Sequence, residues 1–153
     1  MNVKFMDVIN ENEKMLFLHQ NIVNLVNQLQ IPLVEVSLVV AKYTEKLTNR
    51  LNEVAIEHDE KLLEIYSKPW PLEINNSQSS EIKFELDKLM GILDNDRIDI
   101  LDTLIRTSIN LEEITLSDSL LVLRAWEKLV RTQLGNSKSP GELFSTVEIP
   151  EDF

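Results

Sequence analysis

Apolar residues recur at helical spacing near the start of the chain. In the segment 7–30 they advance by three and four positions, the spacing of the a and d positions of a coiled coil or tight helical bundle. We call this set the N-terminal seam, and its members are Met15, Leu18, Ile22, Leu25 and Leu29. The pattern predicts a helix, and Pro32 predicts its end or a kink, because proline lacks a backbone donor and clashes with the preceding turn.

The next segment allows two interpretations. The stretch 31–40 contains many β-branched residues, so its composition fits a strand as well as a helix. We favour a helix, because no partner strand is visible elsewhere in the sequence. The stretch 41–65 repeats apolar residues every three or four positions with charges between them, which predicts a continuous helix. With the segment 7–30, it predicts a long antiparallel hairpin or one kinked rod that pairs with another molecule.

A stretch rich in Pro, Asn and Ser at 67–80 interrupts the helical pattern and predicts a linker. Three shorter helices are predicted beyond it. We expect Asn95 or Asp96 to cap the second and Thr115 or Ser117 to cap the third. The third is expected to end before Gly135, with this glycine as the left-handed residue that often follows a helix.

These elements predict an all-α protein. The expected architecture is an antiparallel helical bundle of about five helices, with a long N-terminal helical hairpin and a smaller C-terminal helical lobe. The expected divisions are the hairpin at 1–66, the linker at 67–80, the lobe at 81–135 and a flexible acidic tail at 136–153. The chain has 153 residues and no cysteine, and this length suffices for a core without disulfides or metal.

Charge and composition argue against several classes of function. The chain has 15 basic and 26 acidic residues and a formal net charge of −11, which would repel the phosphates of nucleic acids and of anionic membranes. It has three glycines, and neither phosphate-loop fingerprint occurs. Because no signal peptide or membrane-spanning stretch is visible, we expect an intracellular protein, cytoplasmic or nuclear.

Candidate catalytic groups are few. The two histidines, His19 and His58, belong to no motif that ties them to a serine and an acid. Four acids with a spacing suited to magnesium lie on one predicted helical face, and these are Glu53, Glu57, Glu60 and Glu64. We favour a solvated acidic face, with Lys61 as a partner of Glu57, and leave metal binding open. We expect no catalytic residue, no metal, no cofactor and no enzymatic activity.

The predicted function is that of a helical interaction protein, a small subunit or adaptor that assembles into a larger complex through apolar helix faces. The N-terminal seam is the expected binding site for a protein partner, with a second copy of this chain as one alternative. The tail predicts a second docking element, because Val147, Ile149 and Phe153 are separated by acids. The alternative function is an acidic inhibitor or immunity-type protein that occupies a basic site on an enzyme or nucleic-acid-binding protein. Its affinity would fall steeply with salt, because salt screens exposed charges.

Overall fold

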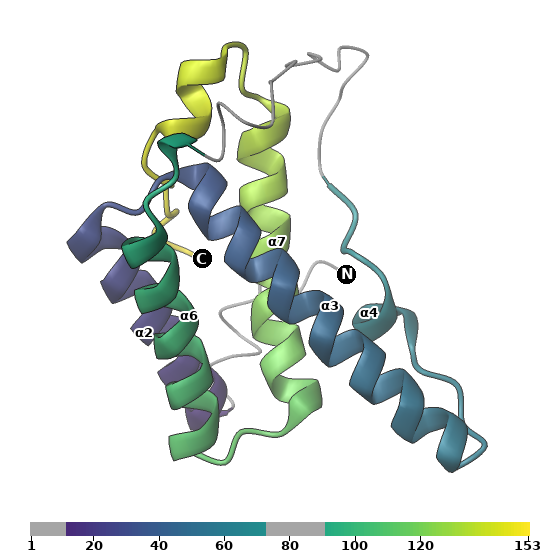
Figure 1. The fold of residues 1–153 in the computed structure, drawn as a ribbon. Coiled ribbons are helices and arrows are strands. Elements are labelled where there is room, and N and C mark those ends of the chain that lie inside the picture. The colour runs from purple at the N-terminus through teal and green to yellow at the C-terminus, as the bar shows by residue number, and fades with distance from the viewer. Residues whose placement is uncertain (1–11, 73–90) are drawn as a thin grey trace.

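The computed structural model describes residues 12–72 and 91–153 (Figure 1). These ranges are helical and contain five α-helices and one 3-10 helix, which confirms the predicted all-α class. The elements are α2 (Glu13–Leu29), α3 (Leu33–Glu57), α4 (Glu64–Ser67), α6 (Asn95–Leu111), α7 (Leu116–Gly135) and η1 (Pro140–Phe144). Most of the predicted linker and the first helix predicted after it lie outside the described residues.

Four helices of the described ranges form a bundle, and they pack chiefly as two antiparallel pairs, α3 with α7 and α2 with α6 (Figure 1). α3 also lies beside α6, and α2 beside α7, and in both of these contacts the two helices run in the same direction. One core cluster draws its buried side chains from all four helices. The segments before and after 73–90 therefore share a core, while the predicted domain boundaries stay predictions.

The β-branched stretch at 31–40 is helical, because α3 begins at Leu33. Pro32 precedes it in an extended conformation, with φ −61° and ψ 151°, and a helix start accepts proline because no donor is needed there. Residues 31–36 are all buried. Because this first turn is covered on every side, its sequence lacks the alternation of apolar and polar faces that identifies an exposed helix. The sequence alone therefore did not distinguish helix from strand here.

The helix predicted to reach residue 65 ends instead at Glu57, so this boundary was wrong. Asp59 turns the chain with a positive φ of 53°, and the backbone N–H of Glu60 donates to the carbonyl of Ala55 at 2.7 Å. The apolar spacing continues beyond the turn to Ile65 in α4, although this side chain is exposed and α4 has no buried residue. A periodic pattern therefore did not reveal the reversal.

Three helix ends in the described ranges use a left-handed residue that is not glycine: Gln30 (φ 49°), Asp59 (φ 53°) and Glu113 (φ 50°). After each, the next backbone N–H donates to the carbonyl five residues earlier, as in a Schellman motif. The expectation for Gly135 was wrong, because this residue is the last of α7 and has no positive φ. There Asn136 ends the helix with φ −91°.

Two side-chain caps begin the helices of the second half. Thr115 caps α7 by accepting from the backbone N–H of Asp118 at 3.2 Å, as predicted. The cap of α6 is Asp94, whose carboxylate accepts from the N–H groups of Asp96 and Arg97, and the expectation of residue 95 or 96 was wrong. Neighbouring acid and amide side chains cap equally well, so the local sequence did not distinguish them.

We predict that Glu113→Gly raises the free energy of unfolding by about 1 kcal/mol, because glycine adopts a left-handed conformation without a steric penalty. Thermal unfolding should shift upward by about 2–4 °C. The matched control is Glu113→Ala, which removes the same charge but keeps the Cβ. An equal gain from alanine would show that charge, and not backbone conformation, sets the effect.

Candidate functional site

The structure places most of the N-terminal seam inside the molecule. Met15, Leu18 and Ile22 are buried in the core formed with α6 and α7, and Leu25 is partly buried against it. Leu29, at the end of α2, is the exposed member of the set. The role of the seam in binding a partner stays a prediction, but three of its five side chains are already covered by this chain.

The apolar residues of the tail also lie on the bundle. We call residues 145–153 the strap. Its start is held by a 2.8 Å hydrogen bond from the N–H of Leu33 to the carbonyl of Ser145. Further along, the Gln133 side chain donates to the carbonyl of Glu148 and accepts from its N–H at 3.0 Å. The three predicted docking residues pack against the chain's own core, with Val147 buried and Ile149 and Phe153 partly buried.

The strap ends on an aromatic cluster between α2 and α7. The Phe153 ring makes T-shaped contacts with the rings of His19 and Trp126, with centroid distances of 4.8 and 5.0 Å. Both of these rings are buried, and the indole N–H of Trp126 donates to Nδ1 of His19 at 3.1 Å. Burial lowers the pKa of His19 below its ordinary value, and a hydrogen bond with the backbone of Phe153 opposes this shift.

Sequence reasoning missed the burial of His19, although a signal was present. Leu16, Val23 and Val26 form a second apolar strip beside the N-terminal seam, and position 19 continues that strip by steps of three and four. A histidine at such a position is a candidate for burial with a hydrogen-bond partner. The partner itself lies 107 residues away and leaves no local signal.

An ion pair between a buried carboxylate and a partly exposed guanidinium joins the starts of α3 and α6. The side chain of Glu35 is 0% exposed, and it accepts from Nε and Nη2 of Arg97 at 2.9 and 2.8 Å. The same carboxylate accepts from the backbone N–H of Asp94 at 3.2 Å. The hydrogen bond to Glu35 raises the pKa of the Arg97 guanidinium. Every charge-bearing oxygen of Glu35 is thereby satisfied, as a buried carboxylate requires.

A second polar contact joins the same two helices about two turns further on. The carboxylate of Asp102 on α6 accepts from the ammonium of Lys42 and the phenol of Tyr43, both on α3. Burial alone would raise the pKa of Asp102, but these hydrogen bonds outweigh it and hold the pKa below its ordinary value. Burial and the bond to Asp102 raise the pKa of Tyr43. The side chains of Lys42, Tyr43 and Asp102 are thus hydrogen-bonded to one another, which is typical of a structural contact between two helices.

Arg124 of α7 is likewise used within the molecule. It is buried, and its guanidinium donates to Glu127, to the hydroxyl of Thr48 on α3 and to the carbonyl of Tyr66 in α4. This residue therefore ties three helices together. Its guanidinium is therefore not part of the exposed surface of α7.

The four glutamates considered for magnesium do not share one helix, because α3 ends at Glu57. Glu53 pairs with Arg50 at 3.1 Å and Glu64 with Lys68 at 3.4 Å. In residues 12–72 and 91–153, no group of three or more His, Cys, Asp or Glu side chains has an arrangement that could hold a metal. The arrangement is that of a solvated acidic surface.

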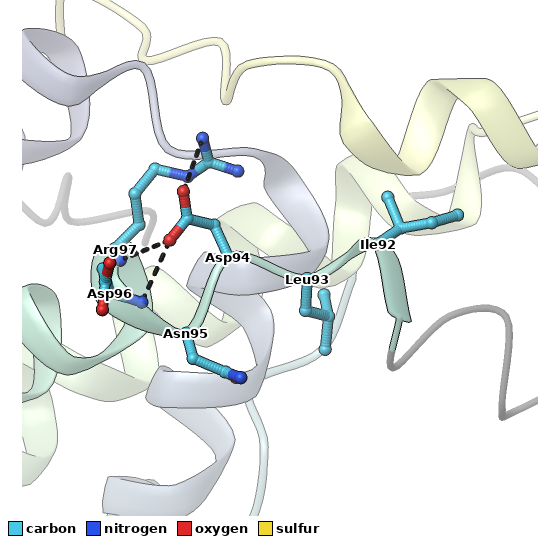
Figure 2. Close-up of a pocket in the computed structure, with 6 residues that line it drawn as sticks. All are labelled: Ile92, Leu93, Asp94, Asn95, Asp96 and Arg97. Carbon is cyan, nitrogen blue, oxygen red and sulfur yellow. Dashed lines mark hydrogen bonds and ion pairs between the residues drawn. The ribbon is translucent and has the colours of Figure 1, made fainter.

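A shallow open depression of about 520 Å³ lies at the start of α6 and is lined by Ile92, Leu93, Asp94, Asn95, Asp96 and Arg97. Figure 2 shows the Asp94 carboxylate directed at the backbone of α6 and at the Arg97 guanidinium. The helix start is thus capped by the chain itself. These polar groups serve the fold and do not converge on a ligand.

The far half of α3 and the chain that returns from it project beyond the bundle (Figure 1). We call residues 51–65 the distal arm. The last buried residue of α3 is Leu47, and α4 has none. Three large aliphatic side chains of the arm are well exposed: Ile56 (76%), Leu63 (66%) and Ile65 (50%). Acidic residues surround them in sequence, and Glu57, Asp59 and Glu60 form no ion pair within the described ranges.

No protein-family model, curated protein or solved structure matches this chain. Among the helices of the described residues, none is long and apolar enough to cross a membrane.

We predict that Arg97→Met destabilises the protein by about 3–5 kcal/mol, because it leaves the buried Glu35 carboxylate without its counter-ion. Glu35→Met should cost less, since the Arg97 side chain is 33% exposed and can be solvated. The double variant should be more stable than Arg97→Met alone. Urea unfolding of all four proteins checks this, and equal losses in the two single variants would contradict it.

We predict that acid destabilises the fold through His19. The unfolded chain takes up a proton near the ordinary histidine pKa of about 6.5, whereas the folded chain resists it because the pKa of His19 is lowered. The contribution of His19 to the free energy of unfolding is therefore complete above about pH 6.5 and falls as the pH drops below that value.

The measurement is the urea midpoint between about pH 7.5 and 5.5. His19→Asn should reduce the dependence on pH, because its side-chain oxygen replaces Nδ1 as the acceptor for Trp126 and does not titrate. The matched control is His58→Asn, which removes an exposed imidazole away from Trp126. An unchanged pH dependence in His19→Asn would show that His19 is not the group responsible.

Proposed function

We propose that this chain is a non-enzymatic helical interaction protein, a small subunit or adaptor that assembles into a larger protein complex through an apolar helix surface. The observation that carries the proposal is the exposure of Ile56, Leu63 and Ile65 on the distal arm. Single exposed aliphatic residues are ordinary on protein surfaces. Three of them within ten residues, spread over the end of α3, the returning chain and the start of α4, are better explained by a partner that covers them.

The proposal assigns the partner to the distal arm and not to the buried part of the N-terminal seam. Binding through Met15, Leu18 or Ile22 would require the bundle to open, because these side chains already pack inside it. The arm is available without rearrangement. A surface that is already exposed binds without the cost of opening the bundle.

One observation favours the alternative, an acidic protein that occupies a basic site on an enzyme or nucleic-acid-binding protein. The arm carries Glu57, Asp59 and Glu60 without ion pairs in the described ranges, and the whole chain has a formal net charge of −11. Exposed charges accelerate association with a basic partner and lose this effect in salt. An apolar contact keeps its affinity in salt, so salt dependence separates the two functions.

The experiment uses a photo-crosslinking residue at position 56 or 63 of the full chain, expressed in its native host. The arm positions should crosslink to a defined protein, whereas the exposed position 103 on α6 should not. Binding to that purified protein should fall at least about tenfold in the double variant Ile56→Ser, Leu63→Ser, the loss expected from two apolar contacts.

The matched control is Ile100→Ser, which removes an exposed aliphatic side chain from another helix and should bind normally. Light scattering on the full chain shows whether the crosslinked protein is a second copy. Equal crosslinking from all positions, or a folded double variant that binds as tightly as the unmodified chain, would overturn the proposal.

A further inference from the structure

The strap makes the kinds of contact that a bound peptide makes. It lies on the bundle through backbone hydrogen bonds at Ser145 and Glu148, and it has an isolated antiparallel bridge between Thr146 and Pro32. Its apolar side chains enter the core at alternate positions, 147 and 149, and again at Phe153. Main-chain bonds give such a segment its affinity, and the side-chain positions give it its specificity.

The seat beneath the strap is built from residues of the helices. The side-chain amide of Gln133 on α7 accepts from the backbone N–H of Glu148 through its oxygen and donates to the carbonyl of Glu148 through its nitrogen. His19 on α2 and Trp126 on α7 are joined to each other by a hydrogen bond, and both rings make T-shaped contacts with the ring of Phe153. Edge-to-face contacts of this kind select an aromatic side chain.

We propose that this seat is a peptide-binding site, which the strap occupies in the isolated chain. Its ligand is an extended acidic segment with aliphatic residues two positions apart and a phenylalanine four positions after the second, as in Val147, Ile149 and Phe153. The occupant that displaces the strap is such a segment of a partner protein. The strap then acts as an internal competitor that keeps the seat closed until the partner is present.

A second copy of this chain is a poorer occupant than a partner protein. Its strap makes the same contacts as the attached strap, but it lacks the effective concentration, on the order of mM, that attachment provides. Exchange between copies is therefore unfavourable at lower concentrations. A partner segment that adds contacts on the bundle overcomes this competition.

The test uses the full chain and a fluorescent synthetic peptide that spans residues 144–153. The variant Phe153→Ala weakens the attached strap, and it should bind this peptide at least about tenfold more tightly than the unmodified chain does, because the competition in cis is reduced. The same peptide with Phe153 replaced by alanine should not bind. Binding is measured by fluorescence anisotropy, with circular dichroism to confirm that each variant is folded.

A second variant keeps the test decisive if Phe153→Ala alters the fold. Gln133→Ala removes the two hydrogen bonds to Glu148, so carboxypeptidase should digest the strap of this variant faster. The control is Arg131→Ala, a matched change at an exposed position of the same helix. Equal digestion of these two variants would overturn the proposal. A folded Phe153→Ala protein that does not bind the peptide more tightly than the unmodified chain would also overturn it. Neither result bears on the distal arm, which lies outside the seat.

Discussion

The buried carboxylate of Glu35 is the contact on which the arrangement of the helices depends. It accepts three hydrogen bonds, all from residues at the start of α6. A buried charge is strongly destabilising without such partners, so the start of α6 is held beside the start of α3 and the two helices run in parallel. The short connection 112–115 then turns α7 antiparallel to both. This orientation places the apolar face of α7 on α3, where the core forms.

The first turn of α3 is also where the strap is anchored. A helix start has backbone N–H groups without partners inside the helix. Pro32 has no N–H group, and the N–H of Leu33 donates to the carbonyl of Ser145 in the strap. The proximal half of α3 thus packs against α6, α7 and η1 and anchors the strap at its first turn, while its buried residues end at Leu47. One helix of 25 residues therefore serves as core at one end and as exposed surface at the other.

Helix faces were predictable from the sequence wherever local periodicity sets them. The apolar steps of α6 and α7, including Leu101, Ile105 and Trp126, point into the core as their spacing indicates. The partners of Glu35 and His19 were not predictable, because they lie 59 to 62 and 107 residues away. Periodicity identified the N-terminal seam as a packed face, but the same pattern arises whether the covering helix belongs to this chain or to another.

The two proposed binding surfaces differ in how they relate to stability. Residues of the distal arm are exposed, so substitutions there can change binding with little effect on folding. The seat of the strap is made of buried groups, His19 and Trp126 among them, and any change in them also changes the core. A surface of the first kind is always available to a partner. A surface built from core residues must be covered when it is not in use, because exposed aromatic surface favours aggregation, and the strap provides that cover.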